Sequence, residues 1–134
     1  MSLGASGIGA HPNLDKLAVM KILVLGSGAR EHAIIKALIR TGTNPENITC
    51  APGNGGIAQE VATIAINQND PAAVTNWSTK NSVDLVVIGP EAPLVAGVSD
   101  ALRVEGIPVF GPSKAAAALE GSKAFAKEVM AAAD

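Results

Sequence analysis

Four glycine- and proline-rich segments contain most of the residues of this chain that could bind a ligand. Glycine lets the backbone approach a ligand closely, and the N–H groups at the start of a following helix attract anions. Arg30 adds a cation, and Asn54 and Glu91 add groups that accept hydrogen bonds from hydroxyls or an amine. This combination predicts a site for a small phosphorylated sugar. The segments are Gly26-Ser27-Gly28-Ala29-Arg30-Glu31-His32, Pro52-Gly53-Asn54-Gly55-Gly56, Gly89-Pro90-Glu91-Ala92-Pro93 and Gly111-Pro112-Ser113-Lys114.

The composition fits one globular domain and excludes several classes of partner. The chain has 134 residues, of which 48% are hydrophobic and 16% are charged, enough for a single core. Its net charge of −2, with one Trp, two Phe and no Tyr, favours neither a nucleic acid nor a membrane surface as partner. Any bound phosphate must therefore be held locally, by backbone amides and one or two cations.

The cysteine content and the terminal residues indicate the cellular compartment and the bounds of the domain. Cys50 is the single cysteine, which fits a reducing compartment, and no apolar run approaches the roughly 18 residues of a membrane span. Residues 1–19 are rich in Gly and Ser and lack the pattern of a secretory signal. We expect residues 1–19 to be a tag or an extended N-terminus without fixed structure, residues 20–134 to form the domain, and the protein to be cytoplasmic.

Short apolar runs closed by turn residues predict the strands. Those around Leu23 and Val86 read as strands buried on both faces. The five expected strands are Lys21–Leu25, Ile48–Ala51, Ala62–Ile66, Asp84–Ile88 and Pro108–Phe110.

Helical patterns lie between these runs. A helix through Ala33 and Leu38 should stop at Gly42, and Asp70 with Pro71 predicts the start of a helix that ends near Asn81. We further expect a helix over Leu94–Glu105 and two more that begin near Ser113 and Ser122. The alternation predicts an α/β domain with a Rossmann-like open parallel sheet and helices on both faces. In such a sheet the carboxyl ends of the strands meet at one edge, so all four glycine-rich segments should lie together.

A dinucleotide-binding domain is the alternative that the first segment suggests. Glu31 stands where the G-x-G-x-x-G pattern has its third glycine. Cys50 and Ala51 stand where an acidic residue would hold the ribose. No Gly-Lys-Ser/Thr follows the first strand, which also excludes a P-loop. A non-catalytic interaction module that has kept this fold is a second alternative.

The four segments, in this order, resemble the glycinamide ribonucleotide synthetase family. Gly-Ser-Gly-Ala-Arg-Glu-His-Ala at 26–33 resembles that family's opening motif, and the stretches at 51–56, 89–94, 111–113 and 119–123 also match it. The resemblance implies the N-terminal, pre-ATP-grasp domain of a purine-biosynthesis ligase. That ligase joins glycine to 5-phosphoribosylamine through a glycyl phosphate, using ATP and Mg²⁺ or Mn²⁺ bound mainly by ATP-grasp domains. We expect those domains and the C-terminal domain to be absent here, and this fragment to bind the phosphoribosyl substrate but to be inactive alone.

The resemblance and the loop pattern together give a set of expected substrate-binding residues. No catalytic residue and no metal ligand is expected among residues 20–134, because no cluster of suitable side chains has ligand spacing. The set is Gly26, Ser27, Gly28, Ala29, Arg30, Glu31, Asn54, Gly55, Pro90, Glu91 and Lys114.

Several members of this set also have a structural interpretation. Arg30 and Lys114 could be surface residues, Glu31 could complement a helix dipole, and Asn54 could form a turn. His32 is expected to pack or hydrogen-bond within its helix. Ala29 replaces a glycine of the family motif, which is harmless if it lies at a helix start with an ordinary φ.

Overall fold

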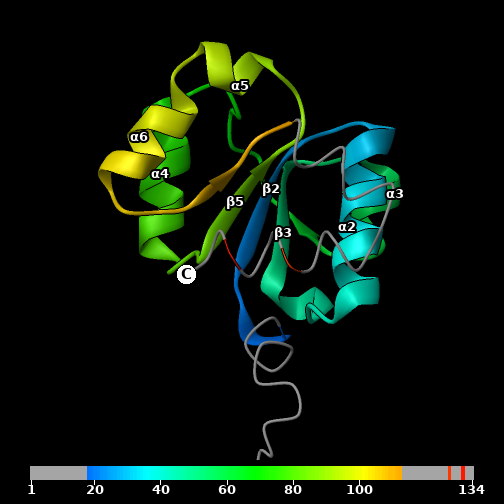
Figure 1. The fold of residues 1–134 in the computed structure, drawn as a ribbon. Coiled ribbons are helices and arrows are strands. Elements are labelled where there is room, and N and C mark those ends of the chain that lie inside the picture. The colour runs from blue at the N-terminus through cyan, green and yellow to red at the C-terminus, as the bar shows by residue number, and fades with distance from the viewer. Residues whose placement is uncertain (1–17, 113–126, 128–130, 132–134) are drawn as a thin grey trace, which may run out of the picture.

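The computed structural model describes residues 18–112, 127 and 131, and it contains an open sheet of five parallel strands (Figure 1). The order across the sheet is β4-β3-β2-β5-β6. The first described strand, β2, lies in the centre. The strands β3 and β4 follow on one side and β5 and β6 on the other, so the order reverses between β2 and β5. The strands are β2 (Ile22–Gly26), β3 (Ile48–Pro52), β4 (Ala62–Thr63), β5 (Leu85–Ile88) and β6 (Val109–Phe110).

Helices cover both faces of this sheet, as Figure 1 shows, which confirms the predicted fold class. The long helix α2 packs on one face with α3, and α4 and α6 pack on the other. The helices are α2 (Ala29–Thr41), the 3-10 helix η1 (Pro45–Asn47), α3 (Gly55–Ala58), α4 (Pro71–Lys80), α5 (Ala92–Val95) and α6 (Val98–Val104).

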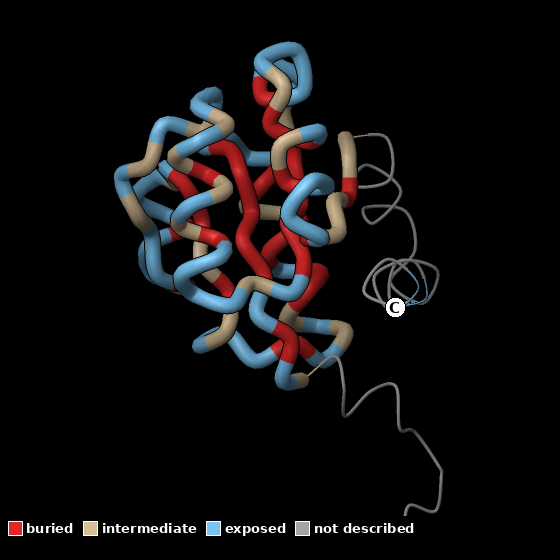
Figure 2. Tube along the Cα trace, turned by 90° about the vertical axis from the view of Figure 1, so that its left-hand side faces the viewer, coloured by how far each residue is buried: buried red, intermediate tan, exposed pale blue. Residues whose placement is uncertain are grey.

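The two faces of the central strand supply two separate cores. Ile22 and Val24 of β2 pack with Ile34 and Leu38 of α2. The alternate residues, such as Leu23, pack with side chains of α4 and α6 on the other face. Every residue of β2 and β5 is buried, which agrees with the buried segments that run through the middle of the molecule in Figure 2.

The start of α4 confirms a local prediction. Oδ1 of Asp70 accepts hydrogen bonds from the N–H groups of Ala72 at 3.1 Å and Ala73 at 3.2 Å, and Pro71 is the first helical residue. The helix ends at Lys80, one residue before the predicted end.

The single helix predicted over Leu94–Glu105 is wrong. Two short helices, α5 and α6, occupy this segment, and Gly97 between them has a left-handed φ of 91°. A glycine in that conformation ends one helix and re-aims the next. The strand predicted over Ala62–Ile66 is likewise shorter, since pairing with β3 covers only Ala62 and Thr63.

The predicted helices from Ser113 and Ser122 lie outside the described residues, apart from single helical positions at 127 and 131. At the other end, Met20 is buried in the core on the α2 face. Just before it, the carbonyl of Ala18 accepts a hydrogen bond from Nδ2 of Asn47 at 3.2 Å.

Candidate ligand site at the carboxyl edge of the sheet

Three of the four glycine-rich segments follow neighbouring strands and lie on one edge of the sheet, the edge at the top of Figure 1. We call them loop A (Gly26–Gly28, from the last residue of β2), loop B (Pro52–Asn54, from the last residue of β3) and loop C (Gly89–Glu91, after β5). Gly26 is in register with Pro52, and Leu25 is in register with Ile88. Loop A therefore lies between the other two, and loops A and C flank the point where the strand order reverses, which is where open α/β sheets bind ligands.

Loops A and B are joined by direct hydrogen bonds. The N–H of Gly53 donates to the carbonyl of Gly26 at 3.0 Å, and Nδ2 of Asn54 donates to the carbonyl of Ser27 at 2.9 Å. Oδ1 of Asn54 accepts from the N–H of Ile57 at 2.9 Å and so caps α3. Asn54 therefore has a structural role, since its side chain caps α3 and holds loop B against loop A.

Loops A and C are joined as well. The N–H of Gly89 donates to the carbonyl of Leu25 at 3.2 Å. From the first turn of α2, Nη1 of Arg30 donates to the carbonyl of Gly89 at 3.4 Å. Arg30 is exposed, and its side chain lies across the reversal point.

Glu31 is buried beneath these loops, with 6% of its surface exposed. Its Oε1 accepts a hydrogen bond from the N–H of Gly28 at 2.8 Å, as the third residue of a capped helix can do. Sequence reasoning placed Glu31 in the site but did not foresee its burial.

The start of α2 has the exposed N–H groups that attract anions at helix N-termini. A helix of 13 residues leaves its first N–H groups without carbonyl partners, and its dipole is positive at this end. Ser27, Gly28, Ala29 and Arg30 are all exposed around it. Ala29 is the first helical residue, and the only described non-glycine residue with a positive φ is Ser82. The alanine is therefore harmless, as its position at a helix start predicts.

Glu91 of loop C and Lys114 of the segment 111–114 are the remaining charged residues that the sequence predicted to bind substrate. Glu91 is exposed, and its carboxylate makes no capping hydrogen bond to the start of α5. Pro90 beside it is half-buried. Lys114 lies outside the residues that the structure describes.

A second acidic residue, Glu60, was missed by the sequence reasoning. Its carboxylate pairs with Nε2 of His32 and lies 3.5 Å from Nζ of Lys36, so it links the segment after α3 to α2. The hydrogen bond from His32 is the main cause that lowers the pKa of Glu60 below 4.5. No sequence signal foretold this pair, because 28 residues separate its members.

Cys50, the single cysteine, lies under the same loops. Its Sγ donates to the carbonyl of Gly26 at 3.3 Å. Burial, together with the nearby charge of Glu31, raises the pKa of this thiol from 9.0 to about 12. The thiol is therefore a buried part of the edge and carries no reactive thiolate.

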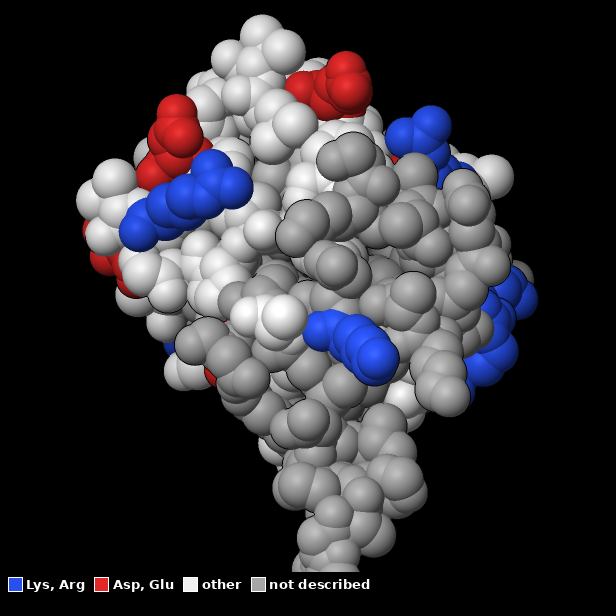
Figure 3. Space-filling view, in the orientation of Figure 1, with Lys and Arg blue, Asp and Glu red and all other residues white. Residues whose placement is uncertain are grey.

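Basic side chains gather on the α2 side of the molecule (Figure 3). The exposed cations of that helix are Arg30, Lys36 and Arg40. Within the described ranges, no group of three or more His, Cys, Asp or Glu side chains could hold a metal ion, and no helix is long and apolar enough to cross a membrane.

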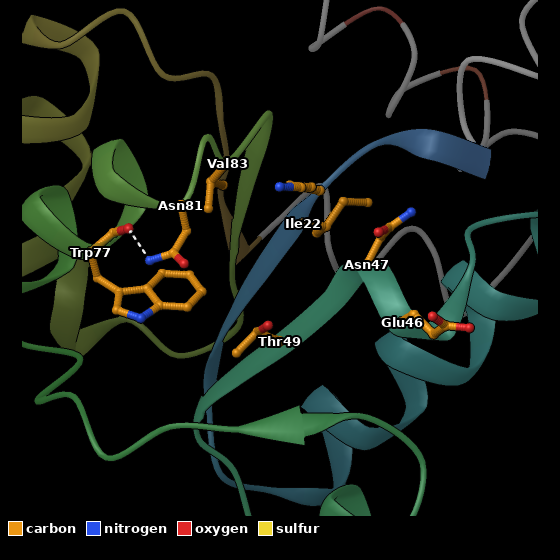
Figure 4. A pocket seen from close by; sticks show the side chains of 8 residues that line it. Ile22, Glu46, Asn47, Thr49, Trp77, Asn81 and Val83 are labelled. Carbon is orange, nitrogen blue, oxygen red and sulfur yellow. Dashed lines mark hydrogen bonds between the residues drawn. The ribbon is translucent and has the colours of Figure 1, made fainter.

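The amino-terminal edge of the sheet has a hollow of about 180 Å³ (Figure 4). Trp77 and Asn81 line one side of it, and Glu46 and Asn47 of η1 lie on the other. Nδ2 of Asn81 donates to the carbonyl of Trp77 at 2.9 Å.

The parallel sheet, with its reversed strand order and helices on both faces, defines an α/β domain of the open, Rossmann-like class, which binds ligands at the carboxyl ends of its strands. Residues 20–120 match the family described as phosphoribosylglycinamide synthetase, N domain, and the chain belongs to that family.

Curated relatives agree with this assignment. The chain is 62% identical over 112 residues to a phosphoribosylamine–glycine ligase of Leifsonia xyli and 56% identical over 114 residues to that of Streptomyces coelicolor. The corresponding ligase of Mycobacterium bovis is 51% identical over 116 residues. The matches cover 83%, 84% and 85% of this chain but only 27% of the length of each relative.

Proposed function

We propose that this chain is the N-terminal domain of a phosphoribosylamine–glycine ligase and that its carboxyl edge binds the phosphoribosyl substrate, 5-phosphoribosylamine. One observation carries the proposal: hydrogen bonds join loops A, B and C at the reversal point of the sheet, beside the exposed start of α2. A preformed edge of this kind binds a ligand with little further ordering, which lowers the cost of binding.

The residues divide into roles by their surroundings. The backbone amides from Ser27 to Arg30 bind the phosphate, and the guanidinium of Arg30 neutralises it. Asn54 of loop B and Gly55 at the start of α3 contact the sugar, whereas Glu91 with Pro90 contacts hydroxyls or the amine from loop C. This assignment is supported by the exposure of Ser27, Arg30, Asn54 and Glu91 on the same edge.

The chain's part in the reaction is to hold and orient the amine that attacks the activated glycine. Orienting a reactant in this way removes translational freedom before the chemical step. ATP with Mg²⁺ or Mn²⁺ supplies the phosphoryl group that activates glycine. The described residues offer no cluster for that metal, so we assign nucleotide, metal and glycine to the parts of the relatives that extend beyond this match, an ATP-grasp region in cis.

We therefore expect the 134-residue chain to release no ADP in a glycine-dependent assay. A cytoplasmic location fits this biosynthetic role. Clear turnover by the purified chain would contradict the division of labour proposed here.

Titration calorimetry tests the binding proposal with three ligands. Glycinamide ribonucleotide, the stable product, should bind, and the same riboside without its phosphate should bind at least about tenfold more weakly, because charge-assisted phosphate contacts are lost. NADH should not bind. Binding of NADH with none of the ribonucleotide would support the dinucleotide-binding alternative instead.

A further inference from the structure

The glycines of loops A and C face one buried side chain, Glu31. A Cβ atom built on Gly26 would lie 2.3 Å from Cγ of Glu31, and one built on Gly89 would lie 2.1 Å from its Oε2 and 2.6 Å from its Cδ. Contacts this short do not occur between real side-chain atoms, so Glu31 occupies the space that a side chain at either position would need.

The two glycines differ in a way that isolates the effect of Glu31. Gly26 has a φ of 137°, which favours glycine whatever its neighbours are. Gly89 is not among the described glycines with positive φ, so its backbone tolerates alanine. The three atoms nearest to a Cβ at Gly89 all belong to Glu31, at 2.1–2.7 Å, so Glu31 is the main obstacle there.

Glu31 is in turn held firmly. It extends from the first turn of α2, it is 6% exposed, and its Oε1 accepts from the N–H of Gly28. One carboxylate thus bonds loop A and fills the space against loop C, at the reversal point where the proposed substrate sits.

We propose that Glu31 is a positioning residue that sets the separation of loops A and C, and that residue 89 is glycine to accommodate Glu31 and not to let the ligand approach. This inference rests on the proposed function only for the identity of the ligand that loops A and C bind. The relation between Glu31 and Gly89 is a property of the packing and is testable without a ligand.

A double-mutant cycle in thermal unfolding tests the packing relation. Gly89→Ala should lower the melting temperature by about 5–15 °C, the usual loss for an overpacked site in a domain of this size. In the Glu31→Ala background the same change should cost no more than about 2 °C, because the obstructing side chain is gone. Gly111→Ala is the matched control, since Gly111 has no positive φ and nothing within 4 Å of a built Cβ.

Conservative replacement separates positioning from direct contact with the ligand. Glu31→Gln keeps the shape of the side chain and the oxygen that accepts from the N–H of Gly28. The Gly28 amide resonance should therefore stay close to its wild-type position, and the affinity for glycinamide ribonucleotide should stay within about threefold of wild type. Glu31→Ala should move that resonance upfield and weaken binding about tenfold, because the loops lose their spacing.

Two results would overturn the inference. The first is an equal loss from Gly89→Ala in both backgrounds. The second is a loss of ribonucleotide binding in Glu31→Gln at unchanged melting temperature and Gly28 shift, which would make the charge of Glu31 a ligand contact. Failure of the wild-type chain to bind the ribonucleotide would instead contradict the proposed function, and the thermal cycle would still decide the role of Glu31.

Discussion

The two edges of the sheet both have polar groups that join neighbouring segments, but they differ in what these segments contain. At the amino edge, the N–H of Lys21 donates to Oδ2 of Asp84 at 2.9 Å and Nδ2 of Asn47 donates to the carbonyl of Ala18 at 3.2 Å, so segments before different strands are joined there. Asn81 bonds locally, to the carbonyl of Trp77. At the carboxyl edge, loops that follow three different strands bond to one another, while Arg30 and Glu91 remain exposed. The amino edge has a hollow of about 180 Å³, whereas the carboxyl edge has joined glycine-rich loops beside the start of α2. The reversal of strand order and the start of α2, rather than open volume or bonding between segments, are the features that favour the carboxyl edge as the proposed ligand site.

Reactivity of Cys50 tests how closed the carboxyl edge is. The pKa of about 12 leaves about a thousandfold less thiolate at mildly alkaline pH than the ordinary value of 9.0 would, so a thiol reagent should label the native chain at least that much more slowly than the chain in denaturant. The labelling rate is followed by absorbance. A native rate close to that of a free thiol would mean that loops A and B open readily, against the preorganised edge described here.

Replacing Arg30 tests which edge binds the phosphate. Arg30→Met should weaken binding of glycinamide ribonucleotide by about 10–100-fold in calorimetry, the usual loss for a charge-assisted hydrogen bond. Arg103→Met is the matched control, because Arg103 is an exposed arginine of α6 that lies 3.9 Å from Oδ1 of Asp100. Equal affinities of the two variants would contradict the proposed position of the phosphate at the start of α2.

The link between Glu60 and His32, which joins the segment after α3 to α2, should make the stability of the domain depend on pH. The folded-state pKa of Glu60 is lowered, so its contribution to stability is present above the unfolded-state value near 4.5 and is lost as the pH falls through the folded-state pKa. Glu60→Gln should therefore lower the urea midpoint near neutral pH, and the difference from wild type should vanish in acid. In a His32→Asn background the effect of Glu60→Gln should shrink at every pH. A difference in urea midpoint between Glu60→Gln and wild type that grows in acid would contradict this pairing.

Trp77 lies at the amino edge, where binding of the ribonucleotide should have the smallest effect. It is the only tryptophan of the chain and lines the hollow there. Saturating ribonucleotide should leave its emission spectrum unchanged, because the ligand binds at the opposite edge. Trp77→Phe should bind the ribonucleotide as wild type does. A shifted or quenched emission would favour a ligand in the amino-edge hollow.

Sequence patterns predicted the elements whose causes are local. The strands around Leu23 and Val86 follow from apolar runs, and α4 follows from Asp70 and Pro71, whose capping chemistry acts within one turn. The break at Gly97 escaped prediction, because the apolar spacing of 94–105 continues across it and a helix interior tolerates one glycine at modest cost. The helix α3 escaped as well, since it begins in two glycines and depends on the Asn54 cap.

The candidate site was predictable only in outline. Parallel topology brings the glycine-rich segments to one edge, so their meeting follows from the order of strands and helices. Which side chains bond across that edge does not, because the contacts of Arg30 with Gly89 and of His32 with Glu60 span 59 and 28 residues. The burial of Glu31 depends on glycine at 26 and at 89 together, a coincidence of three positions with no shared periodicity.

An amide NMR titration of the chain with glycinamide ribonucleotide, with NADH alongside, tests the central claim most directly. The account predicts shifts confined to Gly26–Arg30, Asn54–Gly55 and Gly89–Glu91, with none at Lys21, Asn47 or Asn81. Shifts at the amino edge, or a response to NADH alone, would contradict it.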